Sequence, residues 1–305
     1  MGTKEGSRHV LTTNQLDVSR FEGKLGSTRF LVTMEANPPK GTDLSDILRA
    51  VEGVRGLVDA INVTDGSGAI MRACSLAVAK AVLDAGVDPI LQMTCRDRNR
   101  LALQADLLGA SILDIRNLLL LTGDDPKAGD HPDAKPVFDV NSATLMQVAR
   151  GLAQGKDMAG KELKGAPQFC LGAAADPGAK DLNVEMQKFK AKLDGGAQFF
   201  QTQAVFNAEQ FGAFMSRAKA FGTPVLAGIL LVKSAKMARY MNERVWGIHV
   251  PDDLIARFER SRDARAECVA VTVELIRAVR DAGANGIHLY PLGWEDLVPD
   301  ILKEA

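Results

Sequence analysis

The sequence lacks the residue patterns that would place it among metal-binding, nucleic-acid-binding or secreted proteins. Its four cysteines form neither a CxxC pair nor a Cys/His cluster with metal-ligand spacing. The histidines are as scattered, at His9, His131, His249 and His288. A formal net charge of −1 gives no electrostatic reason to bind a polyanion or an anionic membrane. We therefore expect no metal site, no nucleic-acid partner and no membrane partner.

Other missing features exclude further classes of protein. No apolar stretch reaches the ~20 residues needed to cross a bilayer, and the first residues lack the apolar core of a signal peptide. Together with the unpaired cysteines, this pattern predicts a reduced, cytoplasmic protein. Neither Ser45 nor Ser75 lies in a GxSxG elbow, so nothing supports a serine hydrolase.

Short apolar runs instead alternate with helical patterns along the whole chain, which is typical of βα units and a parallel sheet. The predicted strands are Phe30–Glu35, Val58–Thr64, Pro89–Thr94, Asn117–Thr122, Pro167–Ala173, Ala197–Gln203, Pro224–Leu230 and Gly286–Tyr290. Eight strands favour a (β/α)₈ TIM barrel over an open doubly wound sheet, which often has a GxGxxG after its first strand. None follows here. We expect an N-terminal extension over 1–28 and one barrel domain over 29–305.

Local signals support these units. Apolar residues in 44–51 recur with helical spacing, and Thr42 and Asp43 are candidate N-caps. Three predicted helices end in a glycine that suits a left-handed C′ position just before a strand, at Gly86, Gly196 and Gly283. Long irregular stretches are expected over 1–28, 123–141 and 241–253, and the second would lie on the catalytic face of a barrel.

The ends of the predicted strands carry the candidate functional residues, because a barrel builds its active site there. Glu35 ends the first strand beside Met34 and close to Pro38, so burial could raise its pKa and make it a general acid. The alternative is an acid that caps the next loop or pairs with an arginine. Asp124 could act similarly or simply belong to a turn.

Three further features each have two readings. Gln203 could bind the amide edge of a heterocycle, or be a buried glutamine satisfied by backbone. The run Arg96–Arg100 could bind an anion, or cap a helix and face solvent. His288 inside the last strand is more typical of a core or rim residue than of a ligand.

Taken in order, the strand ends resemble the methylenetetrahydrofolate reductase family over about residues 28–303. The family opens with an apolar strand, a glutamate, two variable residues and Pro-Pro, as in Met34–Lys40. The other matching segments are Val63–Gly66, Met93–Cys95, Thr122–Asp124, Gly196–Phe206, Gly228–Leu230 and His288–Tyr290. Each motif is weak alone, but seven in the right order form a specific pattern.

The resemblance implies a flavin-dependent oxidoreductase that reduces 5,10-methylenetetrahydrofolate to 5-methyltetrahydrofolate, or runs the reverse reaction. Glu35 would protonate the leaving nitrogen as the methylene bridge opens to an iminium ion, and Asp124 would modulate the flavin. The substrate-binding positions implied are Glu35, Asp124, Gln203 and Tyr290. The cofactor-binding positions implied are Thr64, Thr94, Thr122, Gly123, Asp124, Ala174, Glu185, Lys188 and Lys192.

Several positions depart from the family pattern. Gly228-Ile-Leu is followed by Leu231 and later Ala235 where the family often has a folate-stacking aromatic. Ala191 stands where an arginine usually helps to hold the dinucleotide, and alanines fill the end of strand five in place of a tyrosine. The adenine side of the cofactor site is thus altered, so the flavin could be FAD or FMN.

The Glu-x-x-Pro-Pro-Lys-Gly form resembles the branch of the family found in anaerobic one-carbon metabolism. That resemblance implies an iron–sulfur partner subunit as one electron source and NAD(P)H as the other, in a homo- or hetero-oligomer. The chain itself has no iron–sulfur cysteine motif. Two other functions stay open: a pterin-binding methyltransferase barrel, and a non-catalytic flavin-binding electron-transfer subunit.

Overall fold

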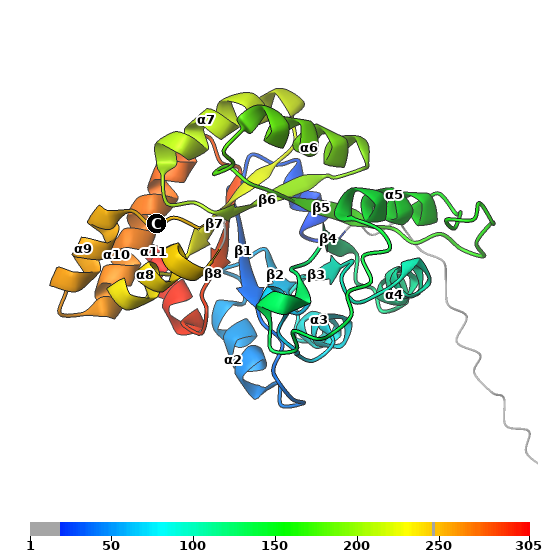
Figure 1. The fold of residues 1–305 in the computed structure, drawn as a ribbon, viewed down its shortest axis with the longest axis horizontal. Coiled ribbons are helices and arrows are strands. Elements are labelled where there is room, and N and C mark those ends of the chain that lie inside the picture. Colours follow the sequence, from blue (N-terminus) through cyan, green and yellow to red (C-terminus); the bar gives the residue numbers. More distant parts are fainter. Residues whose placement is uncertain (1–18, 246–247) are drawn as a thin grey trace, which may run out of the picture.

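The structure, a computed structural model, describes residues 19–245 and 248–305. Its centre is a closed barrel of parallel strands in sequential order, as predicted (Figure 1). The strands are β1 Leu31–Ala36, β2 Ala60–Val63, β3 Pro89–Thr94, β4 Asn117–Leu121, β5 Cys170–Ala175, β6 Phe199–Ala204, β7 Val225–Leu230 and β8 Gly286–Tyr290. The barrel closes where β1 pairs with β8, with Leu31 opposite Gly286. The predicted (β/α)₈ fold class is confirmed.

Strand boundaries were predicted less accurately than strand positions. The bounds of β3 and β8 agree at both ends, whereas β5 begins at Cys170 and not at Pro167. The N–H of Cys170 donates to the carbonyl of Arg116, 2.9 Å away, and this bond starts the pairing with β4. The apolar residues Pro167 and Phe169 therefore belong to the approach to the strand.

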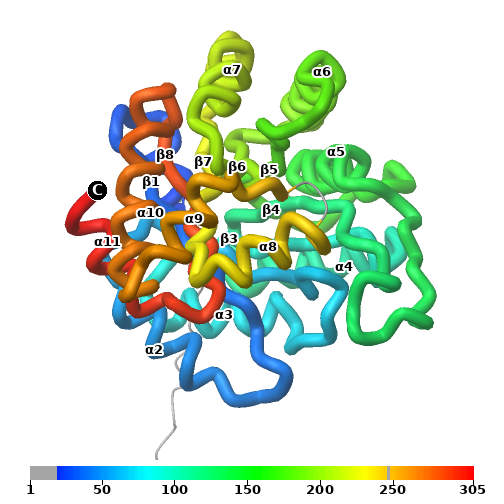
Figure 2. The backbone as a smooth tube through the Cα atoms, turned by 60° about the vertical axis from the view of Figure 1, so that its left-hand side comes forward, coloured from blue at the N-terminus to red at the C-terminus, as the bar shows by residue number. Residues whose placement is uncertain are grey.

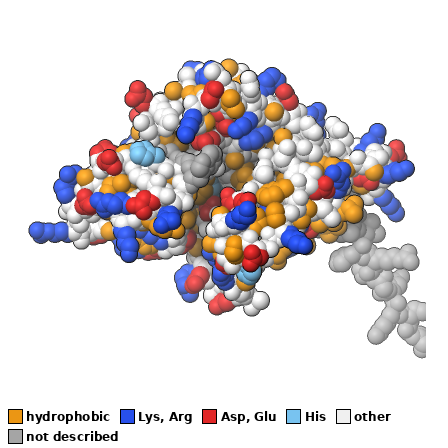
Figure 3. Space-filling view, in the orientation of Figure 1, with side chains coloured by type: hydrophobic (Ala, Val, Ile, Leu, Met, Phe, Trp, Pro, Cys, Tyr) orange, Lys and Arg blue, Asp and Glu red, His pale blue; other side chains and the backbone are white. Residues whose placement is uncertain are grey.

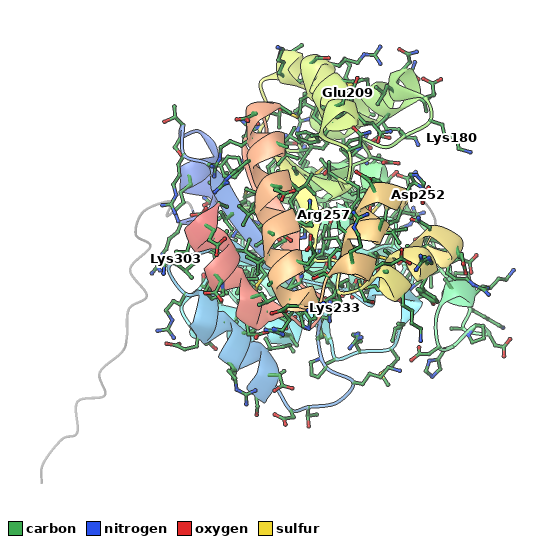
Figure 4. The ribbon with its side chains drawn as sticks, turned by 90° about the vertical axis from the view of Figure 1, so that its left-hand side faces the viewer. Lys180, Glu209, Lys233, Asp252, Arg257 and Lys303 are labelled. Carbon is green, nitrogen blue, oxygen red and sulfur yellow. The ribbon has the colours of Figure 1, made fainter. Side chains whose placement is uncertain are left out.

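Helices surround the barrel on its outer side (Figure 1). The α-helices are α1 Glu22–Leu25, α2 Ser45–Val54, α3 Ser75–Asp84, α4 Arg100–Ile112, α5 Ser142–Ala153, α6 Leu182–Asp194, α7 Ala208–Ala218, α8 Ala235–Arg244, α9 Asp252–Arg260, α10 Ala264–Asp281 and α11 Val298–Glu304. Short 3₁₀ turns occur at η1 Ser67–Ala69, η2 Pro126–Ala128, η3 Lys219–Phe221 and η4 Glu295–Leu297. In Figure 4, Arg257 lies between α9 and α10, and its guanidinium donates to Glu267 and Glu274.

The amphipathic helix predicted over 44–51 is α2, with two corrections. Its N-cap is Leu44, not Thr42 or Asp43, although the Asp43 carboxylate accepts the N–H of Ser45 at 2.9 Å. Leu48 was expected on the buried face but is 40% exposed. Ten helical residues turn only a narrow stripe inwards, and Ile47, Val51 and Val54 fill it.

The predicted helix, glycine and strand module is confirmed at all three places. Gly86, Gly196 and Gly283 have φ values of 87°, 117° and 95°, a left-handed conformation that a side chain would strain. The irregular stretch expected over 241–253 is shorter, because α8 runs to Arg244 and α9 begins at Asp252. Residues 246–247 within it lie outside the part of the chain that the structure describes.

The amino-terminal end of the barrel is closed by a chain segment that precedes β1. Phe21 is fully buried and meets Phe199 edge-on, with ring centroids 5.1 Å apart. The rest of this apolar layer comes from the first halves of the strands and consists of Leu31, Ala60, Ile90, Leu119, Cys170 and Leu226. The expected boundary between an extension over 1–28 and a barrel over 29–305 stays a prediction, and residues 1–18 lie outside the described part.

Above this apolar layer the barrel interior is polar. Asn62 and Gln201 exchange hydrogen bonds of 2.6 and 3.0 Å across the barrel, and Gln201 also donates to the Thr33 hydroxyl at 3.0 Å. The same hydroxyl lies 2.9 Å from Nδ1 of His288, whose pKa burial lowers to about 3. His288 is thus a neutral core residue, and this hydrogen-bonded layer forms a fixed floor beneath the carboxyl ends of the strands.

Two properties of the described residues bear on environment. No helix among them is both long enough and apolar enough to cross a membrane. On the face shown in Figure 3, basic and acidic side chains are interspersed, so neither sign dominates it.

Candidate active site

Glu35 lies at the carboxyl end of β1, where burial changes its acidity. The residue is 8% exposed, and the side chains on both sides of it in the strand, Met34 and Ala36, are buried as well. Burial raises the pKa of Glu35 to about 7, against a smaller lowering effect of a hydrogen bond from Asn37. A carboxyl group with this pKa is populated in both protonation states near neutral pH. No arginine is paired with it among the ion pairs of the described residues.

Asn37 and Thr64 form a short chain of hydrogen bonds behind Glu35. Nδ2 of Asn37 donates to Oε1 of Glu35 at 3.2 Å. Oδ1 of the same amide accepts from the Thr64 hydroxyl at 2.9 Å. Thr64 was predicted to bind cofactor, and Asn37 was missed because its position in the motif varies. The pattern of a polar residue between Glu35 and Pro38 was the only sequence signal for it.

Tyr290 enters the same site from the end of β8. Its hydroxyl donates to the carbonyl of Thr202 at 3.0 Å. Burial, and then the charge of Glu35, raise the pKa of Tyr290 well above its usual value, so the phenol stays protonated. The structure therefore brings together Glu35, Thr64 and Tyr290, three of the residues predicted from sequence.

Gln203 lies near the end of β6, and its side chain is exposed. The alternative reading of a buried, satisfied glutamine is wrong for Gln203 and instead describes Gln201, two residues earlier. The register of β6 against β7 shifts between Gln201 and Ala204, and beyond this irregularity the side chain of Gln203 is exposed whereas that of Gln201 is buried. Over 19–245 and 248–305 no hydrogen bond to the Gln203 amide is formed, which leaves its donor and acceptor for a ligand.

The segment after β4 was predicted to carry Thr122, Gly123 and Asp124. Oδ2 of Asp124 accepts the N–H of Gly68 at 3.0 Å, so this exposed carboxylate connects the loops after β4 and β2. The Thr122 hydroxyl accepts the N–H of Ser142 at 3.3 Å and lies with Phe138 in a pocket of about 460 Å³ beside the barrel end. Gly123 is left-handed, with φ 93°.

The basic run after β3 mostly serves structure. Asn99 caps α4 by accepting two backbone N–H groups at 3.1 Å. The guanidinium groups of Arg96, Arg98 and Arg100 each bind a carboxylate. Because these charges are already paired, the anion-binding reading loses support. One of those acids, Asp65, also holds Thr94 in place, because its carboxylate accepts a hydrogen bond from the Thr94 hydroxyl at 2.9 Å.

The predicted cofactor residues on β5 and α6 form a second group. Nζ of Lys192 donates to the carbonyl of Ala174 at 2.6 Å, and burial lowers the pKa of this lysine. Glu185 is buried and accepts the N–H of Asp176 at 2.9 Å. Lys188 is exposed. Of the two lysines, Lys188 is the one whose charge is open to a phosphate.

Two loops at this end of the barrel are joined by residues that the sequence did not indicate. Figure 2 shows the loops after β1 and β4 on the same side of the molecule. Lys40 of the first binds Asp130 of the second, and Asp130 also accepts the N–H of Met71 at 2.9 Å. These contacts lower the pKa of Asp130 far below its usual range. The described residues include no group of three or more His, Cys, Asp or Glu side chains suited to a metal ion.

The exposed side chains of Gln203, Asp124 and Lys188 carry hydrogen-bonding and charged groups of the kind that a flavin requires. The rings of a flavin and a pterin present N–H and C=O groups at their edges, and the amide of Gln203 and the carboxylate of Asp124 offer matching acceptors and a donor. The exposed charge of Lys188 suits a phosphate. The residues present therefore fit a flavin.

The fold and the site together define a (β/α)₈ barrel whose ligand-binding end carries a buried acid and an open amide. The family model for methylenetetrahydrofolate reductase matches residues 20–305. The chain belongs to the methylenetetrahydrofolate reductase family.

Individual relatives agree with this assignment. Methylenetetrahydrofolate reductase 1 of Schizosaccharomyces pombe is 23% identical over 87% of this chain and 44% of its own length. A probable methylenetetrahydrofolate reductase (NADPH) of Caenorhabditis elegans is 28% identical over 75% of this chain and 34% of its own. The chain thus spans less than half of these two proteins. The 5,10-methylenetetrahydrofolate reductase of Pectobacterium carotovorum is 23% identical over 88% of both chains.

Solved structures resemble the chain in fold. A Clostridium thermocellum protein that binds two copies of 5-methyl-5,6,7,8-tetrahydrofolic acid superposes with a TM-score of 0.62 at 15% identity, over 90% of this chain and 96% of that one. The TM-score for 2,3-dimethylmalate lyase is 0.53 at 12% identity, over 95% of this chain and 85% of that one. At these identities the likeness supports the barrel and nothing finer.

Proposed function

We propose that this chain is a flavin-dependent methylenetetrahydrofolate reductase in which Glu35 is the general acid. The observation that carries the proposal is a buried carboxyl group with a pKa of about 7 at the end of β1, in a barrel of this family. When bound, reduced flavin supplies the hydride. FAD and FMN both stay open, because neither Ala191 nor the end of β5 offers the usual contacts to the adenine side.

Glu35 would supply the proton that the reaction needs. As the bond between the methylene carbon and the folate nitrogen breaks, the electron pair stays on nitrogen, which takes the proton of Glu35. The carbon takes the hydride, so that one hydride and one proton convert the methylene bridge to a methyl group. Glu35 then recovers a proton from solvent, and its pKa near 7 allows both steps.

Gln203 and Asp124 would orient the substrate. The open amide of Gln203 can pair with the amide edge of the pterin ring, which needs a donor and an acceptor side by side. Asp124, whose carboxylate accepts the N–H of Gly68, would hold a negative charge near the rings. Tyr290, which stays protonated, would lie beside the acid and exclude water from it.

The test is a single turnover without air. The chain is loaded with FAD or FMN, the flavin is reduced with dithionite, and methylenetetrahydrofolate is added while flavin absorbance is followed. We expect reoxidation of the flavin and formation of methyltetrahydrofolate. Glu35→Gln should bind and reduce flavin normally yet reoxidise at least about a hundredfold more slowly, because the proton donor is lost.

The same experiment separates the alternatives. A methyltransferase barrel would retain no flavin absorbance after reconstitution. A non-catalytic electron-transfer subunit would bind and reduce flavin but form no methyl product. If Glu35→Gln reoxidised its flavin at the rate of the parent protein, the assignment of Glu35 as general acid would be wrong, but the reductase activity would still be supported.

The electron donor, assembly and location of the protein stay predictions. Fast reduction of the bound flavin by NAD(P)H would show that the chain needs no iron–sulfur partner subunit. The homo- or hetero-oligomeric state and the cytoplasmic location would be measured by light scattering and by cell fractionation.

A further inference from the structure

We propose that Asn37 is a positioning residue that sets the proton affinity of Glu35 and turns one carboxyl oxygen towards the ligand, with Thr64 holding the Asn37 side chain in place. The inference rests on the proposed function only where it names the ligand as a folate. The hydrogen bonds that support it lie within the protein and do not depend on the ligand.

The direction of the amide decides its effect. Asn37 Nδ2 donates to Oε1 of Glu35 at 3.2 Å. In the reverse orientation the amide oxygen would face the carboxylate oxygen, and two acceptors would repel each other. The carboxylate, which only accepts, therefore favours the observed orientation, and the Thr64 hydroxyl, which donates to the amide oxygen at 2.9 Å, holds the far end of the amide in place. Thr64 is itself held, being 1% exposed and bonded through its N–H to the carbonyl of Ala36.

No other group competes for this role. Within 19–245 and 248–305, Asn37 is the only side chain that hydrogen-bonds to Glu35. On β8, the Tyr290 hydroxyl is used by Thr202 and His288 is neutral. After β2, the carboxylate of Asp65 binds Thr94 and Arg98 instead.

The arrangement matches the acidity of Glu35 to its task. Burial disfavours the carboxylate and the amide donor favours it, and the balance leaves the pKa of Glu35 at about 7. Because Asn37 occupies Oε1 only, Oε2 is the oxygen that can face the folate nitrogen. Loss of the amide should therefore raise the proton affinity and also release the carboxyl group to rotate.

The closing experiment measures Glu35 directly in the full chain without flavin or folate. Carboxyl-carbon NMR of ¹³C-glutamate-labelled protein gives the titration midpoint of Glu35, whose signal is assigned by its loss in Glu35→Gln. Asn37→Leu should raise this midpoint by about one pH unit, a tenfold change in proton affinity, because a hydrogen bond to a charged group is removed. Thr64→Val should raise it less, and Thr64→Ser should restore it.

A double variant tests whether Thr64 acts through Asn37. In Asn37→Leu, the added Thr64→Val should have no further effect on the midpoint. A matched control is Thr272→Val, since Thr272 is a buried threonine on α10 whose hydroxyl has Cys268 as its one side-chain hydrogen-bond partner among the described residues. The titration midpoint of Glu35 in this control should equal that in the parent protein.

An unchanged midpoint in Asn37→Leu, or equal effects of Thr64→Val with and without Asn37, would overturn the inference. These results do not depend on the reaction, because no substrate is present. If the midpoints move as expected while the flavin-loaded chain fails to reduce methylenetetrahydrofolate, the proposed function fails and the positioning role stands.

Discussion

Glu35 shows how the surroundings of one residue decide its chemistry. In water its carboxyl group would be almost fully ionised at neutral pH and could not serve as an acid. At the end of β1 the same group is buried, and its pKa of about 7 keeps a substantial fraction protonated. The sequence indicated Glu35 as a candidate acid through its position, and the structure provides the physical cause of its raised pKa, which is burial.

The first residue-level prediction concerns the pH dependence of flavin reoxidation by methylenetetrahydrofolate. The protonated form of Glu35 is the active one, so the rate should be constant below its pKa and fall tenfold per unit above about 7. Single-turnover absorbance over a range of pH measures it. A decline that begins near the ordinary carboxyl value would contradict the acid assigned here.

The second residue-level prediction concerns the pH dependence of protein stability. Because the folded pKa of Glu35 is raised, its contribution is fully favourable below the unfolded value of 4.5 and is lost as pH rises to about 7. Glu35→Gln cannot ionise and should escape this loss, gaining up to about 3 kcal/mol relative to the parent between acidic and mildly alkaline pH. Urea unfolding at the two pH values measures the gain.

Glu209→Gln is the control for that measurement. Glu209 is exposed in the first turn of α7 and lies at the edge of the molecule, far from Lys233 after β7 in Figure 4. Its substitution should change stability by less than about 0.5 kcal/mol at either pH. A stability gain as large as that of Glu35→Gln would show that the gain comes from removing any carboxyl group and not from the burial of Glu35.

At the scale of elements, the ligand-binding end depends on contacts between loops far apart in sequence. Lys40 and Asp130, which join the loops after β1 and β4, are 90 residues apart. The loops after β2 and β4 approach so closely that a Cβ on Gly129 would lie 1.8 Å from the carbonyl oxygen of Ala69. Only a glycine fits there, although its own φ of −103° is ordinary.

We therefore expect Gly129→Ala to separate these loops and destabilise the fold by roughly 1–3 kcal/mol, as overpacking does. Methylenetetrahydrofolate binding should weaken too, because Asp124 belongs to the displaced loop. Thermal unfolding and ligand titration measure the two effects. Gly41→Ala is the control, since no atom lies within 4 Å of its added Cβ, and it should behave as the parent.

Elements were predictable where their signals are local. Strand positions, helix faces and the left-handed glycines follow from residues within one turn or one strand. Asp130 could not be found this way, because its partners Lys40 and Met71 come from other loops. The exposure of Gln203 and the burial of Gln201 could not be predicted either, because the register of β6 against β7 shifts between Gln201 and Ala204 and that shift depends on the neighbouring strand.

At the scale of the molecule, the two ends of the barrel have different roles. The amino-terminal end is filled by apolar side chains and closed by Phe21. The carboxyl end rests on the hydrogen-bonded layer of Asn62, Gln201, Thr33 and His288 and carries the polar site. Stability and ligand binding are therefore separated along the barrel axis.

Phe21→Ala should test this separation. Removing the fully buried ring leaves a cavity and should cost about 3–5 kcal/mol of stability, with little change in the flavin spectrum of the protein that stays folded. Phe138→Ala removes a ring that is 37% exposed and should cost less than about 1 kcal/mol. Equal losses from the two would contradict a closing role for Phe21.

The sequence by itself determined the alternation of strands and helices, and with it the barrel, because backbone geometry and apolar periodicity are local properties. It also placed Glu35 at a strand end and ordered the motifs of the family. Only the tertiary structure decided the acidity of Glu35, the pairing of the arginines and the link from Thr64 through Asn37. Burial and hydrogen bonding depend on which distant segments meet, and that is settled only when the barrel closes.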